Sequence, residues 1–104
     1  MTQWFKELIE KIHMTVLLGP YVCYSDMKDN EGFTGIAAID TSSITMHCWD
    51  RTTPGLLQFD LYSCKDFDME IVFKELKIFK PQKIQYMFVD RDSDLKVVRE
   101  GTYK

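Results

Sequence analysis

Histidine and cysteine, the side chains that most often bind transition metals, are scarce in this chain of 104 residues. The chain has two histidines, His13 and His47, and three cysteines, Cys23, Cys48 and Cys64. Neither residue type occurs at the paired spacing of a zinc motif, so we expect no metal site. The odd number of cysteines also argues against a disulfide framework, and the expected state is reduced thiols in the cytoplasm.

The chain also lacks a long hydrophobic run and an excess of positive charge. No apolar stretch approaches the ~20 residues that span a bilayer, so no membrane segment is expected. The first residues do not follow the charged-then-apolar order of a secretory signal. A net charge of −3 offers no basic patch for phosphate backbones, which argues against a nucleic-acid partner. We therefore expect one cytoplasmic domain over residues 1–104, long enough for a single two-layer core.

Hydrophobic periodicity is what the chain does contain. Phe5, Leu8 and Ile12 recur at helical spacing, and Val72 and Leu76 do so in a second segment. The pattern predicts helices over residues 2–12 and from 66 onwards. It predicts strands over 14–24, 35–40, 43–49, 56–63 and 83–90, and the last of these is expected to be a central strand. Residues 91–104 are expected to form a frayed or edge segment. This order predicts an α+β fold, a two-layer α/β sandwich with a mostly antiparallel sheet and two helices on one face.

The sheet face away from the helices has a predictable composition. Alternation along the strand over residues 43–49 places Ile44 and Met46 on one face, and His47 and Trp49 on the other. In so small a domain, a sheet face without a helix is left to water or to a second molecule. An uncovered, partly apolar face favours self-association, so we expect a homodimer.

The segment from residue 34 to residue 64 carries an ordered set of chemical side chains. It contains Thr34-Gly35, then Thr41-Ser42-Ser43, then His47-Cys48-Trp49, and finally Ser63-Cys64. This set resembles the small-subunit, prokaryotic form of the S-adenosylmethionine decarboxylase family, whose pattern reads Ser-Gly, Glu-Ser-His, His-Thr-Trp and Thr-Cys at similar spacing. The resemblance is clearest over residues 32–66 and identifies a divergent, N-terminally shortened member, since the chain begins in a helix where the family has a first strand.

The resemblance implies a role for four side chains. Ser42 would attack the carbonyl of Thr41 and become the precursor of a pyruvoyl group, the cofactor that this family makes from its own chain. His47 and Thr34 would assist this processing as a proton donor or acceptor and a supporting hydroxyl. Cys64 would protonate the substrate carbon after CO2 is lost. We expect Ser42, His47 and Cys64 to cluster near one end of the sheet, together with Thr34, because strand adjacency brings the hairpin and the following strand together.

The resemblance also implies a small-molecule substrate, S-adenosylmethionine or a related amino acid, whose decarboxylated product enters polyamine (spermidine) synthesis. Asp50 stands near the position of a carboxylate that binds the ribose hydroxyls. Phe33 and Trp49, with Tyr24, offer aromatic surface for stacking an adenine ring. The residues that the resemblance implies for substrate binding are therefore Asp50, Trp49 and Phe33.

A second interpretation stays open, because the sequence departs from the family pattern beside the cleavage serine. Thr41 stands where the family has glutamate, and Ser43 stands where it has histidine. A non-processed, inactive relative that binds a ligand, regulates or dimerises would also fit. Thr-Ser-Ser is ordinary turn chemistry in that case. His47 is then a hydrogen-bonded surface residue, and Cys64 is a small apolar side chain.

Overall fold

The computed structural model describes residues 2–40, 42–50, 55–63, 67–90 and 95–103, with the side chain of Asp90 left aside. Within these ranges the order of elements is α1 (Thr2–Lys11), β1 (Val16–Ser25), β2 (Gly32–Ile39), β3 (Ser42–Trp49), β4 (Leu56–Tyr62), α2 (Met69–Leu76) with a 3₁₀ turn (Lys77–Phe79), β5 (Ile84–Asp90) and β6 (Lys96–Tyr103). The expected α+β class, with two helices and antiparallel strands, is confirmed. The chain forms two compact units, residues 1–72 and 73–104, and the expectation of a single domain over 1–104 stays a prediction.

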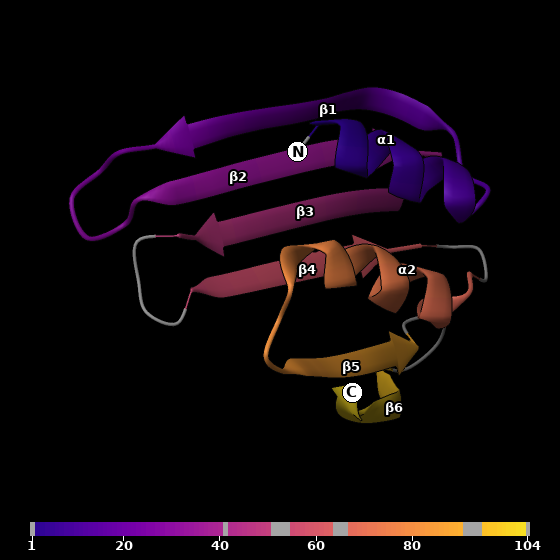
Figure 1. Cartoon of the computed structure of the whole chain (residues 1–104). Coiled ribbons are helices and arrows are strands. Elements are labelled where there is room, and N and C mark those ends of the chain that lie inside the picture. The colour runs from indigo at the N-terminus through magenta and orange to yellow at the C-terminus, as the bar shows by residue number, and fades with distance from the viewer. Residues whose placement is uncertain (1, 41, 51–54, 64–66, 91–94, 104) are drawn as a thin grey trace. The chain divides into compact units, whose positions relative to one another are not determined.

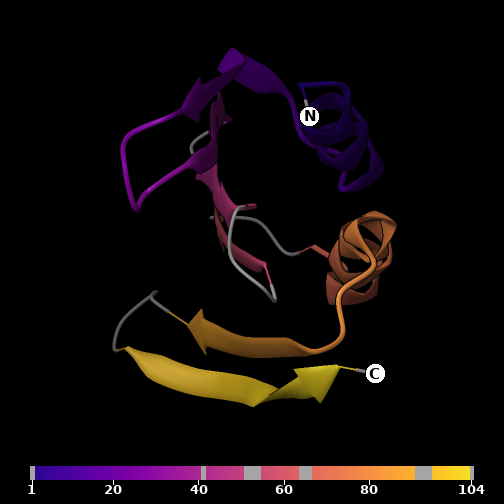
Figure 2. The same cartoon turned by 60° about the vertical axis from the view of Figure 1, so that its left-hand side comes forward.

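The first unit is built on a four-stranded sheet with the order β1-β2-β3-β4. Each neighbouring pair is antiparallel, as short hairpin connections require. Figure 1 shows these strands side by side in chain order, and Figure 2 shows α1 and the first turn of α2 on the same side of them. The predicted hairpin over residues 35–49 is confirmed, with Ile39 opposite Ser42 at its closed end.

Helix α1 packs on the sheet through the predicted apolar stripe. Phe5, Leu8 and Ile9 are almost fully buried, and the ring of Trp4 meets that of Phe59 on β4 edge to face, with 5.8 Å between the ring centroids. On the sheet the matching core residues are Ala37, Ile39, Ile44 and Met46. These four alternate along β2 and β3, which explains why only one face of each strand is buried.

The end of α1 is fixed by a Schellman motif. The His13 N–H donates to the carbonyl of Glu10 and the Met14 N–H to that of Ile9, both at 3.0 Å. His13 takes the left-handed conformation, with φ of 61°, at the position where glycine is usual. The apolar contact that accompanies this motif is available, because Ile9 and Met14 are both buried. The helix therefore stops at a defined residue and turns directly into β1.

Gly35 allows α1 to approach β2 closely. A β-carbon built at this position would collide with the ring of Phe5, which is fully buried. The glycine of the Thr34-Gly35 pair therefore has a packing role, which is to let an aromatic ring rest on bare backbone. Its neighbour Thr34 points to the opposite face, because side chains alternate along a strand.

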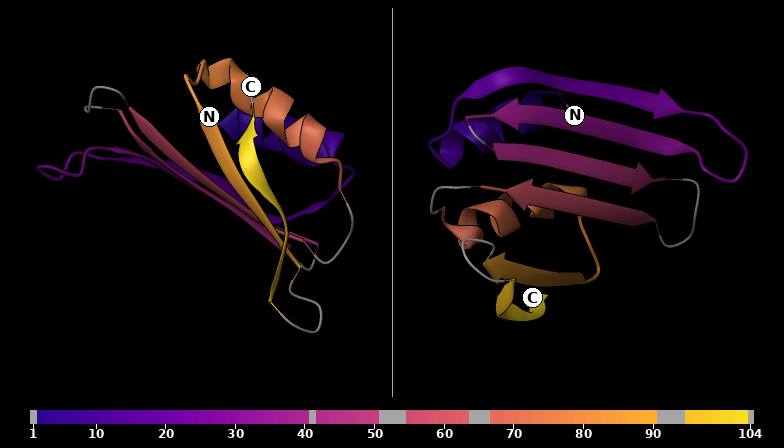
Figure 3. Two further views of the ribbon diagram at one scale, coloured as in Figure 1. Left: turned by 90° about the horizontal axis from the view of Figure 1, so that it is seen from below. Right: turned by 180° about the vertical axis from the view of Figure 1, so that it is seen from behind.

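The far face of the four-stranded sheet is open and partly apolar. Figure 3, in its right-hand panel, shows strands β1–β4 from this side, with α1 behind them. Leu18, Tyr21, Ile36 and Tyr62 belong to this face by register and are all exposed, Tyr21 to 64% and Ile36 to 46%. This surface, called the outer face below, is the one for which the sequence predicted a partner.

The second unit bears on two expectations. The segment expected to be frayed or at an edge forms strand β6, which pairs with β5 from Ile84 opposite Tyr103 to Asp90 opposite Lys96. It is therefore an edge strand and is not frayed. Strand β5, expected to be a central strand, belongs to a two-stranded sheet in the described residues. The charged residues of β6 interrupt the apolar alternation from which a strand would be predicted. Its ring contacts are non-local, since Phe73 stacks on Tyr103 with 4.3 Å between ring centroids.

The close approach at Gly35 generates a prediction about stability. Gly35→Ala should lower the free energy of unfolding by about 1–3 kcal/mol, the usual cost of overpacking a core. Thermal or urea unfolding of the purified protein measures the change.

A double-mutant cycle with Phe5→Leu separates the ring contact from a general effect of alanine in the strand. Because leucine leaves room above residue 35, adding Gly35→Ala to Phe5→Leu should cost much less than adding it to the natural chain. Equal costs in the two backgrounds would show that the ring contact does not account for the glycine.

Candidate functional site

A row of polar side chains crosses the outer face near one end of the sheet. The register places Cys23 opposite Thr34, Thr34 opposite His47, and His47 opposite Gln58. Thr34 Oγ1 lies 3.1 Å from His47 Nδ1, which is a hydrogen bond between neighbouring strands. His47 is exposed on this face, and an imidazole can both donate and accept a proton. A hydroxyl bonded to an accessible imidazole suits proton transfer.

The residues expected to bind substrate lie at this same end of the sheet. Trp49 follows His47 on the same face of β3, with 6.0 Å between their ring centroids. Tyr24 and Phe33 meet edge to face at 4.9 Å on the neighbouring strands. Asp50 follows Trp49 directly and accepts a hydrogen bond from the Tyr24 hydroxyl at 3.3 Å. By register Trp49 shares the outer face with His47, whereas Tyr24 and Phe33 belong to the face of Cys48. The aromatic rings and the carboxylate therefore gather at one end of the sheet, but on its two faces.

Ser42 lies at the opposite end of the hairpin, so the expected clustering of Ser42 with His47 and Thr34 within one chain is wrong. Ser42 is the first residue of β3, and the register pairs it with Ile39 at the turn. His47 is five residues further along, a distance of about 17 Å at the usual rise of a strand. Alternation also places Ser42 on the face of buried Ile44, whereas His47 belongs to the outer face. An antiparallel hairpin separates these residues by construction.

The backbone at the hairpin turn is anchored to the start of the sheet. The Asp40 N–H donates to the carbonyl of Thr15 at 2.9 Å. Thr41 and Cys64 lie outside the described residues, so the scissile peptide and the expected proton-donor thiol are left as sequence expectations. Ser42 itself is half-buried and is the first residue of β3.

The two described thiols have different surroundings. Cys23 is exposed, in the row that contains Thr34 and His47. Cys48 is half-buried and opposes Phe33 on the other side of the strand. Burial raises the pKa of the Cys48 thiol, because a thiolate loses hydration there, and the nearby Asp50 carboxylate raises that pKa further. Cys48 is therefore the less nucleophilic of the two.

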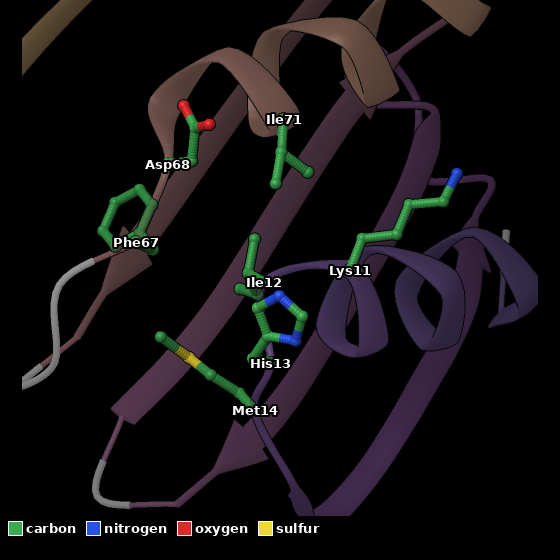
Figure 4. A pocket seen from close by; sticks show the side chains of 7 residues that line it. All are labelled: Lys11, Ile12, His13, Met14, Phe67, Asp68 and Ile71. Atoms are coloured by element: carbon green, nitrogen blue, oxygen red, sulfur yellow. The ribbon is translucent and has the colours of Figure 1, made fainter.

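A shallow hollow of about 630 Å³ lies on the helix side of the first unit, where α1 ends and α2 begins. Figure 4 shows the side chains that line it, which are Lys11, Ile12, His13, Met14, Phe67, Asp68 and Ile71. Asp68 accepts a hydrogen bond from the Glu70 N–H at 2.9 Å and so caps the start of α2. Among the predicted site residues that the structure describes, none lines this hollow, and the Thr34–His47 pair is on the opposite face of the sheet.

The described residues give two negative findings. They include no group of three histidine, cysteine, aspartate or glutamate side chains arranged to hold a metal ion. No helix among them is long and apolar enough to cross a membrane.

Sequence reasoning missed one residue of this end of the sheet. Asn30, in the loop between β1 and β2, accepts a hydrogen bond from the Trp49 indole N–H at 2.8 Å. A lone asparagine in a polar loop reads as turn chemistry, so no local signal distinguishes it. Only the pairing of β2 with β3, which brings the loop beside Trp49, makes the contact visible.

Comparison with known proteins points to the family suggested by the motifs. The model of the family described as S-adenosylmethionine decarboxylase matches residues 1–92. An S-adenosylmethionine decarboxylase proenzyme from Archaeoglobus fulgidus is 30% identical over 88 residues, which cover 83% of this chain and 73% of that protein. No solved structure gives a significant match.

The contrast between the two thiols generates a prediction. Iodoacetamide at pH 8 should alkylate Cys23 faster than Cys48 in the folded protein, because Cys23 is exposed and the Cys48 thiolate is disfavoured. Peptide mass spectrometry of a time course measures both rates, and a sample unfolded in urea serves as the control. Asp50→Asn should accelerate the modification of Cys48 by a factor of up to about five, the effect of one surface charge. Equal rates for the two thiols in the folded protein would contradict this assignment.

Proposed function

Because the chain belongs to the S-adenosylmethionine decarboxylase family, we propose that it cleaves itself at Ser42 and decarboxylates S-adenosylmethionine through the resulting pyruvoyl group. The observation that carries the proposal is the hydrogen bond between Thr34 and His47. These are the two positions where the family pattern places the residues that assist processing, and they meet on an accessible face. Composition alone gave no reason to expect a threonine and a histidine to pair there.

Ser42 would supply the nucleophile for processing. Its Oγ attacks the carbonyl carbon of Thr41, the C–N bond of the 41–42 peptide breaks, and the nitrogen of residue 42 takes up a proton, which leaves an ester. Loss of the Ser42 α-proton then expels the Thr41 carboxylate by β-elimination. Water finally replaces the nitrogen of residue 42, which leaves as ammonia. Each stage moves a proton, and general acid–base assistance by a histidine contributes a factor of roughly 10²–10⁴ to such steps.

The residues of this chain fit the group that processing would create. Ser42 begins β3 directly after the two-residue turn, so a cut before it leaves the new end held in the sheet by the pairing of Ser42 with Ile39. The pyruvoyl group supplies a conjugated carbonyl that withdraws electrons as CO2 is lost. Asp50, Trp49 and Phe33 would bind the ribose and adenine of the substrate, and Cys64 would return the proton to carbon.

The separation of Ser42 from the Thr34–His47 pair leads to a proposal about assembly. Within one chain the pair is about 17 Å from Ser42, too far for direct proton transfer. A second copy packed on the outer face, related by a two-fold axis that lies in the plane of the sheet and across the strands, would exchange the two ends of the hairpins. The Ser42 end of each hairpin would then lie over the Thr34–His47 pair of the other copy. Because Ser42 belongs to the helix-side face, its hydroxyl would reach that pair around the end of β3 and not from the outer face. The exposed apolar side chains of the outer face supply the contact for such a dimer.

Self-cleavage is tested by the mass of the freshly purified protein. The natural chain should yield a fragment ending at Thr41 and a second fragment beginning with a pyruvoyl group, together with CO2 release from S-adenosylmethionine. Ser42→Ala should give the intact mass and no CO2, and His47→Ala should slow cleavage about a hundredfold or more. An intact natural chain after prolonged incubation, with no CO2 released, would favour the non-processed relative, as the residues Thr41 and Ser43 allow.

Assistance between copies is tested by complementation. Ser42→Ala and His47→Ala chains are produced together, with a tag that distinguishes their masses. Only the His47→Ala chain should be cleaved, because it keeps Ser42 and borrows the imidazole of its partner. Ile36→Lys places a charge at the centre of the outer face and should abolish both the dimer seen by sedimentation and the complementation. Absence of cleavage in a verified mixed dimer would refute assistance between copies.

A further inference from the structure

We propose that Asn30 and Tyr24 are positioning residues that fix Trp49 and Asp50 for the nucleoside part of the substrate. The inference rests on the proposed function, which places Trp49 and Asp50 at the substrate. It adds a pair of residues that neither the family pattern nor the sequence singled out for this task. Both act through a side-chain hydrogen bond that crosses between separate elements.

Asn30 fixes the plane of the Trp49 ring. The indole ring has one hydrogen-bond donor, its N–H. This N–H donates to the Asn30 side-chain oxygen at 2.8 Å, a short hydrogen bond. Rotation of the Trp49 ring would break this bond, so the indole is held in one orientation. The same ring lies tilted by 41° against His47, which links the loop to the polar row on the outer face. A stacking surface requires this kind of fixed ring.

Tyr24 orients the carboxylate of Asp50. Its hydroxyl donates to Asp50 Oδ1 at 3.3 Å, and its ring is set against Phe33 at 4.9 Å and 73°. Asp50 is exposed at the end of β3, where a carboxylate without a tether would rotate freely. This single hydroxyl contact restricts the rotation and leaves the rest of the carboxylate to accept from a diol. The aromatic partner Phe33 explains why a tyrosine, with a long rigid ring, performs this task.

Gly32 permits the approach of the loop to β3. A β-carbon at this position would collide with the carbonyl of Cys48 and lie close to the Cα of Trp49. The backbone that follows Asn30 therefore passes directly against the backbone of β3. Asn30 is therefore two residues from a point where the backbones of β2 and β3 pass in direct contact.

The positioning role of Asn30 and Tyr24 is tested in two stages. The first stage does not require the protein to be catalytically active. In protein labelled with ¹⁵N-tryptophan, the indole N–H signals of Trp4 and Trp49 are assigned with Trp4→Phe. Asn30→Ala should shift the Trp49 signal to higher field and speed its exchange with solvent, whereas Asn30→Asp, which keeps an oxygen acceptor, should shift it much less. Met27→Ala, an exposed side chain of the same loop, serves as the matched control and should leave it in place.

The second stage measures the use of substrate. Asn30→Ala and Tyr24→Phe should each raise the KM for S-adenosylmethionine about three- to tenfold, the range for loss of one hydrogen bond. The kcat, the extent of self-cleavage and the melting temperature should change little. Asn30→Asp should restore KM to within about twofold, and Asn30→Ala combined with Trp49→Phe should be no worse than Trp49→Phe alone, since both remove the same bond.

The outcomes separate the inference from the function beneath it. If the natural protein decarboxylates S-adenosylmethionine but Asn30→Ala and Tyr24→Phe leave KM unchanged, the positioning role is overturned and the proposed function stands. A fall in melting temperature with KM unchanged would likewise overturn it, because the ties would then be structural only. If the natural protein neither binds nor decarboxylates S-adenosylmethionine, the proposed function fails, and the inference that rests on it fails with it.

Discussion

The contact between the ring of Phe5 and the bare backbone at Gly35 is the constraint on which the first unit depends. It sets the helix at the centre of β2 and buries one face of the hairpin. Because side chains alternate, the same contact turns the next residue, Thr34, to the outer face, where it meets His47. Gly35, which the packing of Phe5 requires, and Thr34, which pairs with His47, are therefore consecutive residues of β2. A shift of register by a single residue would exchange them and destroy both.

The elements of the first unit could be read from the sequence because their signals are local. The stripe of α1 and the alternation in β2 and β3 each fall within a dozen residues, and the hairpin follows from a two-residue turn between apolar strands. The second unit was harder, because β6 is charged and shows no clean apolar alternation, although it pairs with the strand that directly precedes it. Its aromatic contacts, such as Phe73 on Tyr103, have no signature in either segment alone.

The candidate site also contains contacts that the sequence could predict and contacts that it could not. The pairing of Thr34 with His47 follows from the turn, and so does the distance of Ser42 from both, once the register is written out. The expectation that they would cluster was drawn from the adjacency of the strands, without regard to the antiparallel direction that places Ser42 and His47 at opposite ends. The hydrogen bond between Asn30 and Trp49 could not be predicted from the sequence, because it depends on the path of a polar loop and on the close approach of the backbones at Gly32. Side-chain ties between a loop and a strand are decided by tertiary structure.

The register of the hairpin also determines what a break in the chain at residue 41 would do. Such a break opens the connection between β2 and β3, but seven facing residue pairs still join the two strands, from Phe33 opposite Cys48 to Ile39 opposite Ser42. The piece before the break keeps α1, β1 and β2, and the piece after it keeps β3 and β4, so each core surface still finds its counterpart. The first unit is thus organised as two complementary halves of a split protein, which a covalent link helps to assemble but which strand pairing and burial can hold together without it.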